Sequence, residues 1–122
     1  MKIEYAERAL RDIDDCLFWS ARNFGRQAAY RYKTLLSVSI REIANDPALP
    51  GHRNLEGFEP LVRLYHIRHS RRRADVGGLI VKQPRHFIAY QAENDMLTIL
   101  RVLHDSMDVE RQTGGMKEKS SG

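Results

Sequence analysis

The chain has 122 residues, 42% of them hydrophobic and 30% charged, with a formal net charge of +4; this balance fits one soluble globular domain and excludes a disordered chain. No apolar run approaches the ~20 residues of a membrane-spanning helix, and the first ten residues lack the apolar centre of a signal peptide. Because Cys16 is the single cysteine, disulfides do not hold the fold together, and we expect a cytoplasmic protein that does not contact a membrane.

The first half of the chain predicts one strand and two helices. Residues 1–5 are typical of a short strand. Apolar residues then recur at three- and four-residue steps from Ala6 to Phe24, which predicts an amphipathic helix ended by Gly25 in the left-handed conformation. A second helix is predicted as far as about Asn45, and the short join makes the two helices an antiparallel hairpin. The predicted buried positions are Leu10, Ile13, Leu17, Ala21 and Phe24 in the first helix, and Ala28, Tyr32, Leu35, Leu36, Ile40 and Ile43 in the second.

The second half of the chain predicts a loop and three strands. Residues 45–60 hold three of the four prolines and two glycines, which predicts a surface loop. Segments rich in β-branched and aromatic residues predict strands at residues 61–69, 85–91 and 96–104, and the last two form a hairpin through a tight polar turn. The order β-α-α-β-β-β indicates an α+β fold, in which a helical hairpin packs on a small antiparallel sheet.

Two segments fall outside these elements. Residues 70–84 contain Gly77 and Gly78, and they either extend a hairpin arm or form a loop. Residues 113–122 are polar and glycine-rich, and they predict a flexible tail.

The positive charge is concentrated in residues 61–90. This segment has seven lysines and arginines against Asp75 alone, so its net charge is +6 and the rest of the chain carries −2. A local basic surface favours an anionic partner, which is RNA, DNA or an acidic protein surface. Solvated arginines along an exposed edge give the same pattern.

Several motifs, taken in this order, resemble the ParE-type toxins of the RelE/ParE superfamily. They are NFG between the helices, the loop sequence DPALPG, Arg63 in the following strand, RHFIAYQ, and ILRVLHDSMD. The last motif is the most specific, and its matching residues are Ile99, Arg101, Val102, Leu103, His104, Met107 and Asp108. The resemblance covers residues 1–112 as one toxin domain, and the segment 70–84 departs from it because that connection is usually short in the family.

The resemblance implies a RelE/ParE-like fold and a bacterial toxin of a type II toxin–antitoxin (plasmid stabilisation) system. A cognate antitoxin encoded by a neighbouring gene would neutralise it, with its tail wrapping the helical hairpin and adding a strand or helix against the sheet. ParE-type toxins poison DNA gyrase, whereas RelE-type toxins cleave mRNA in the ribosome, and the fold alone does not choose between them. A member that has lost its toxicity and only binds its antitoxin is a third interpretation.

A metal-independent RNase of the RelE type needs a proton acceptor, a cation for the phosphorane charge and an aromatic platform. Residues of these types are His66, His69, His86, Arg63, Arg85 and Tyr90. RelE-like nucleases carry decisive basic and aromatic residues at the C-terminal end. Here that end contains Asp105, Asp108 and Glu110, which repel a phosphate. The sequence therefore favours a binding toxin without catalytic residues or a cofactor.

The motif at the end of the last predicted strand gives the expected target contacts: Arg101, His104, Met107 and Asp108. His104 is expected to end the strand, and Asp105 to cap a short terminal helix or arm while Met107 packs back on the core. Arg101 on an interior strand needs an ion pair, for which Glu4 and Asp108 are candidates, or a partner that covers it. Neighbours on a strand point to opposite faces, so His104 and Asp105 do not predict a metal site.

Three aromatic residues lie off the predicted buried sides of the helices. They are Phe18, Trp19 and Tyr30. We expect the antitoxin to cover them, and at least one of them to be half-exposed in the free toxin. Cys16, in the middle of the first helix, is interpreted as a small apolar thiol in the core.

Overall fold

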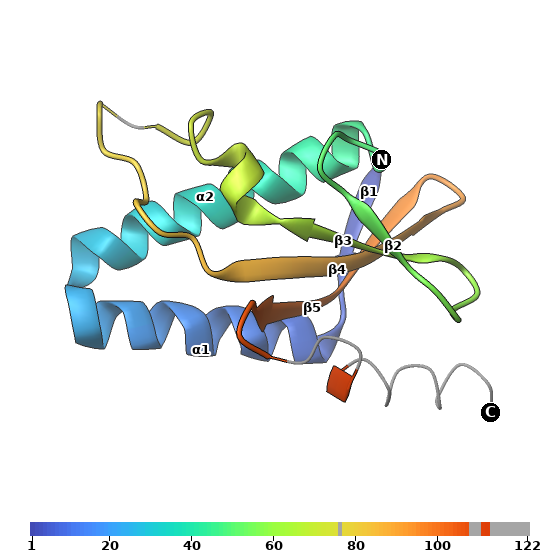
Figure 1. Ribbon diagram of the computed structural model, residues 1–122, viewed down its shortest axis with the longest axis horizontal. Helices are drawn as coiled ribbons and strands as arrows, with labels where there is room; N and C mark the ends of the chain where they lie inside the picture. Colours follow the sequence, from blue (N-terminus) through green and yellow to red (C-terminus); the bar gives the residue numbers. More distant parts are fainter. Residues whose placement is uncertain (76, 108–110, 113–122) are drawn as a thin grey trace.

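The structure is a computed structural model, and it describes residues 1–75, 77–107, 111 and 112 (Figure 1). The predicted tail at 113–122 and the predicted target contact Asp108 lie outside the described residues. No helix in the described part of the chain is both long and apolar enough to cross a membrane.

The first half of the chain folds as strand β1 (Lys2–Tyr5), helix α1 (Glu7–Phe24) and helix α2 (Arg26–Asn45). This confirms the predicted order and the helical hairpin. Gly25 alone joins the helices, and its N–H bonds to the carbonyl of Ala21 at the end of α1. Its positive φ of 93° and the end of α1 before it confirm the predicted glycine stop, although its ψ of 168° is extended and not that of a left-handed helix. The chain reverses direction at this residue, and α2 begins at the next one.

The second half contributes four strands and a short 3-10 helix to the fold. These elements are β2 (Arg53–Leu55), β3 (Val62–His66), η1 (Ile67–Ser70), β4 (His86–Glu93) and β5 (Met96–His104). The sheet order is β1-β5-β4-β3-β2, with β1 parallel to β5 and the other neighbours antiparallel. The α+β fold with a helical hairpin is confirmed, but the sheet is mixed and not purely antiparallel. Strand β2 was missed within the predicted loop.

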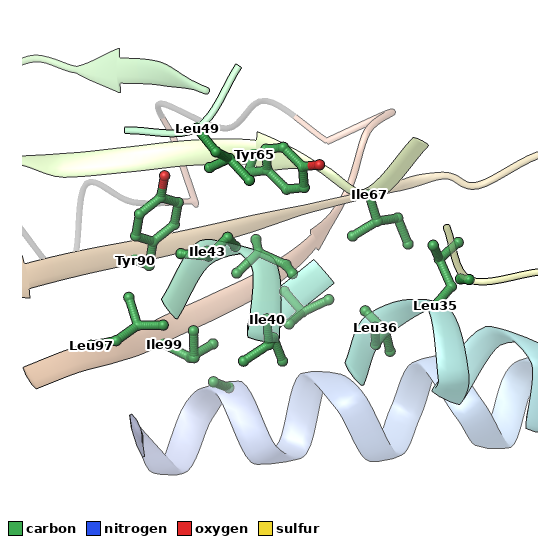
Figure 2. Packing of buried hydrophobic residues seen from close by; sticks show 14 of the residues in the cluster. Leu35, Leu36, Ile40, Ile43, Leu49, Tyr65, Ile67, Tyr90, Leu97 and Ile99 are labelled. Carbon is green, nitrogen blue, oxygen red and sulfur yellow. The ribbon is translucent and has the colours of Figure 1, made fainter. Parts of the chain in front are cut away.

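Both helices cover one face of the sheet (Figure 1). The main core lies between α2 and this face (Figure 2), and its members include Leu35, Leu36, Ile40 and Ile43 of α2 with Tyr65, Ile88, Tyr90, Leu97 and Ile99 of the sheet. The predicted buried side of α2 is confirmed except at Ala28, which is half-buried. In α1, the predicted burial of Leu10 and Phe24 is wrong: they are 48% and 68% exposed, whereas Ala9 and Ser20 are buried. The side of α1 that faces the core is therefore narrower and built of smaller residues than predicted.

A second apolar cluster lies on the opposite face of the sheet. Its buried members are Val62, Leu64, Ala89 and Leu103, and Leu55, Phe58, Phe87 and Leu100 pack against them. Strands β3, β4 and β5 thus carry apolar side chains on both faces, as predicted for β5.

Residues 70–84 form an arm that is tied to the rest of the fold. Gly77 and Gly78 have φ values of 61° and 84° and lie in a turn, and the described residues of the arm contain no regular strand. Arg71 donates through Nη1 to the carbonyl of Lys82 at 2.8 Å, which closes the arm on itself. The arm is therefore a loop closed by a hydrogen bond, and it does not extend a β-hairpin.

Candidate functional site

Arg101 pairs with a carboxylate that the sequence did not indicate. Its Nε lies 2.8 Å from Oδ2 of Asp12 and its Nη2 lies 3.2 Å from Oδ1, and the backbone N–H of Val102 donates to the same Oδ2. Arg101 is only 7% exposed. The expected ion pair is present, but Glu4 and Asp108 were the wrong partners, because α1 lies beside β5 where β1 has ended. Against the prediction, this guanidinium binds inside the fold and is not free for a target.

Asp105 forms the centre of a polar cluster at the end of β5. Its Oδ2 lies 3.0 Å from Nε2 of His66, and its Oδ1 accepts a hydrogen bond from Nε of Arg85 at 2.9 Å. Burial alone would raise the pKa of Asp105, but the hydrogen bonds from His66 and Arg85 outweigh burial and lower it. Both oxygens are used in these contacts, and most of the terminal segment that Asp105 was predicted to cap lies outside the described residues.

His104 and Met107 lie beside this cluster. Nδ1 of His104 accepts a hydrogen bond from the backbone N–H of Ser106 at 3.1 Å and lies 2.7 Å from its Oγ. His104 is the last residue of β5, which confirms that it ends the strand. Met107 is 45% exposed, so its predicted packing on the core is wrong. A partly exposed imidazole and an exposed thioether thus lie together at this corner of the molecule.

The histidines proposed for RNA cleavage do not form a common site. His66 lies opposite Phe87 in the sheet, with ring centroids 4.8 Å apart, whereas His86 lies opposite His104. Consecutive residues of a strand point to opposite faces, so the imidazoles of His66 and His86 are on different sides of the sheet. Nδ1 of His86 lies 2.5 Å from the hydroxyl of Tyr32, and burial lowers the pKa of His86 to about 4.

The other residues of the RNase hypothesis also contact or pair with other parts of the fold. Tyr90 is fully buried, and its hydroxyl donates to the carbonyl of Pro47 at 2.6 Å. The ring of His69 fills the space beside Gly51, and Arg63 lies opposite Tyr90 on the helix-covered side of the sheet. Arg85 is engaged by Asp105. A proton acceptor, a cation and an exposed aromatic platform therefore do not converge among these six residues.

Cys16 is half-buried, with its Sγ 3.9 Å from Nδ1 of His86. Burial raises the pKa of this thiol to about 12, so it is a thiol and not a nucleophilic thiolate at neutral pH. Among the described residues, no three His, Cys, Asp or Glu side chains are arranged so that they could hold a metal ion.

Aromatic side chains are exposed around the tip of the helical hairpin. The exposed fractions are 64% for Phe18, 59% for Trp19, 68% for Phe24 and 66% for Tyr30. Trp19 and Phe24 pack edge to face at 5.5 Å, and the guanidinium of Arg22 lies 5.8 Å from the ring centre of Phe18. All three aromatic residues singled out in the sequence are exposed, and Phe24 adds a fourth, which was misplaced because its spacing fits the helical period. Exposed aromatic groups of this kind are typical of protein interfaces.

Comparisons with known proteins identify the fold and the family of the chain. A solved structure described as "Chromosomal ParDE TA system from P. aeruginosa" is similar, with a TM-score of 0.53 at 12% sequence identity, covering 85% of this chain and 95% of that one. At this identity the likeness concerns the fold alone. A comparison with curated protein sequences gave no match. Residues 3–109 match the family described as "ParE toxin of type II toxin-antitoxin system, parDE", and the chain therefore belongs to the ParE toxin family.

Proposed function

We propose that this ParE toxin acts in the bacterial cytoplasm by binding DNA gyrase and holding it with cut DNA attached, without catalytic residues or a cofactor of its own. Membership of the ParE family supports a gyrase target. The observation that carries the binding mechanism is the internal engagement of the polar residues on the sheet: His66 and Arg85 bind Asp105, and His86 binds Tyr32. Side chains occupied in this way are poorly suited to proton transfer on a substrate.

The corner formed by His104 and Met107 is the proposed contact with the target, with Asp108 adjoining it in sequence. Both described side chains are accessible, since the side chain of His104 is 37% exposed and Met107 is 45% exposed. Methionine adapts its shape to an apolar partner surface, and an exposed imidazole offers a hydrogen bond at its edge. His104 is the last residue of β5, and the backbone N–H of Met107 donates to the carbonyl of His104 at 3.0 Å.

The hairpin tip is the proposed contact with the cognate antitoxin, which a neighbouring gene encodes. Phe18, Trp19 and Tyr30 are each exposed to water in the free toxin. Burial of such aromatic residues supplies much of the binding energy in protein interfaces. Covering this surface would also make the toxin more soluble.

A supercoiling assay with purified gyrase tests the proposal. We expect the toxin to stop supercoiling, and a His104→Ala/Met107→Ser variant to be much less active. A matched control is Leu79→Ser, because Leu79 is an exposed apolar residue, 55% accessible, and lies in the segment 70–84 and not at the end of β5. Normal supercoiling at a large excess of the toxin contradicts the proposal. New 5′ ends within codons of mRNA after toxin induction would instead support cleavage in the ribosome.

A further inference from the structure

A groove of about 490 Å³ lies between the first turns of α2 and the arm of residues 70–84. It is lined by Arg26, Gln27, Tyr30, Arg31 and Thr34 of α2 and by Ala74 and Leu79 of the arm. Figure 1 shows the arm, in yellow, leaving the sheet on the side of α2 and returning to β4. The groove is thus formed by two segments that are far apart in the sequence.

The arm is held firmly enough to serve as a wall of the groove. Arg73 forms an ion pair with Glu42 of α2, and the hydroxyl of Ser70 donates to the same carboxylate. Ala74 is buried and packs in the main core, together with Val81 from the returning half of the arm. Leu79 lies between these anchors and is 55% exposed. An apolar side chain on an anchored arm faces water unless another molecule covers it.

The charged side chains that line the groove are all positive. Arg26 and Arg31 are the charged residues that line it, and neither forms an ion pair with a described residue. A second groove of about 600 Å³ is different, because Arg73 there is already bound to Glu42 and Asp46 also lines it. The first groove thus offers two uncompensated guanidinium groups beside the exposed apolar groups of Tyr30 and Leu79.

We propose that this groove binds an acidic segment of the antitoxin that carries one bulky apolar side chain. The carboxylates pair with Arg26 and Arg31, which can each hold a carboxylate through two parallel hydrogen bonds. The apolar side chain packs between Tyr30 and Leu79. The inference rests on the proposed antitoxin partnership, and it extends that interface, because Tyr30 belongs both to the hairpin tip and to the groove. A nucleic acid fits less well, since its backbone needs a longer row of cations than two arginines.

Charge reversal on the intact toxin tests this inference. Calorimetry with the purified cognate antitoxin compares the wild type, Arg26→Glu/Arg31→Glu and the matched control Arg8→Glu/Arg11→Glu, which changes the net charge equally at exposed positions of α1. We expect at least about a tenfold loss of affinity for the groove variant at low salt, a smaller difference at high salt, and less than about a threefold loss for the control. Leu79→Ser, at an exposed position, should also weaken binding while leaving thermal unfolding unchanged.

The outcomes separate this inference from the function on which it rests. Tight antitoxin binding that both double variants weaken equally, or that neither weakens, overturns the groove assignment and leaves the antitoxin partnership intact. Absence of binding by the wild type overturns both. A single-stranded DNA or RNA oligonucleotide that binds the wild type, is lost in the groove variant and does not compete with the antitoxin would assign the groove to a nucleic acid and overturn the inference.

Discussion

The hydroxyl of Tyr32 in α2 lies 2.5 Å from Nδ1 of His86, the first residue of β4. The same hydroxyl accepts a hydrogen bond from the backbone N–H of Arg85 at 3.0 Å. Tyr32 therefore donates to a neutral imidazole and ties the beginning of β4 to the helical hairpin. This contact also makes the stability of the fold sensitive to acid, because a protonated Nδ1 no longer accepts the proton of the phenol.

The free energy of unfolding should fall between about pH 6.5 and pH 4. Burial lowers the pKa of His86 to about 4 in the fold, whereas the unfolded chain takes up a proton near the usual value of 6.5. The stabilisation is complete above pH 6.5 and is lost as the pH falls toward 4, by up to about 1.4 kcal/mol for each pH unit. Urea denaturation at several pH values measures this slope. His86→Asn keeps an acceptor for Tyr32 and should flatten the slope, and an unchanged slope contradicts the assignment.

Removal of the phenolic hydroxyl should destabilise the fold without changing its shape. Tyr32→Phe leaves the Arg85 N–H and Nδ1 of His86 without this partner, and we expect a loss of about 1–3 kcal/mol in the free energy of unfolding. Tyr30→Phe is the matched control, because Tyr30 is exposed and Tyr32 is buried. Thermal unfolding of the two variants gives the comparison. Equal stabilities would show that the contact between Tyr32 and His86 does not stabilise the fold.

Asp12→Ala should be among the most destabilising substitutions on α1. It leaves the guanidinium of Arg101 buried and unpaired, which costs about 3–5 kcal/mol. The double variant Asp12→Ala/Arg101→Met removes the unpaired charge and should recover a large part of this loss. A double-mutant cycle by urea denaturation separates the pair from its surroundings. A single-variant loss below about 1 kcal/mol would contradict a buried ion pair.

Two glycines with nearly the same φ offer a controlled test of packing. Gly51 and Gly25 have φ values of 96° and 93°, but a Cβ on Gly51 would lie 2.8 Å from Cδ2 of His69, whereas Gly25 has nothing within 4 Å. Gly25→Ala reports the backbone strain alone, at about 1–3 kcal/mol for its positive φ and extended ψ. Gly51→Ala adds displacement of the His69 ring, so its loss should be larger by about 1–2 kcal/mol. Chemical denaturation of both variants measures the difference, and equal losses would mean that the ring moves freely.

Substitution at the hairpin tip should separate binding from stability. Phe18→Ala/Trp19→Ala removes two exposed rings, so we expect little change in unfolding but at least about a tenfold loss of antitoxin affinity. Trp19 is the single tryptophan, so its fluorescence reports on this surface alone. The emission of the wild type should shift when the antitoxin is added. An unchanged emission together with unchanged affinity would remove the hairpin tip from the interface.

The parts of the fold that were predictable have strong local patterns. The apolar period of α2 fixed both its extent and its buried side, and the strand pattern of 96–104 matches β5 residue for residue. Strand β2 has three residues in a proline-rich segment and exists because it pairs with β3, with Arg53 opposite Leu64. Periodicity over a few residues does not reveal such a strand.

The candidate site was less predictable because its contacts join distant parts of the chain. Asp12 and Arg101 are 89 residues apart, and His66 and Asp105 are 39 apart. The sequence indicated that Arg101 needs a carboxylate, but many carboxylates were available. The exposed aromatic residues of α1 were found because they break the helical period, whereas Phe24 was misplaced because it follows that period.

The proposed mechanism is that this toxin holds gyrase on cut DNA, with no bond broken by its own side chains. The most direct measurement is a plasmid cleavage assay with purified gyrase and toxin, in which the protein is digested before electrophoresis. We expect linear plasmid that accumulates with the dose of toxin and disappears when the antitoxin is added. Intact plasmid at every dose, together with mRNA cleavage on ribosomes that His66→Ala abolishes, would contradict it.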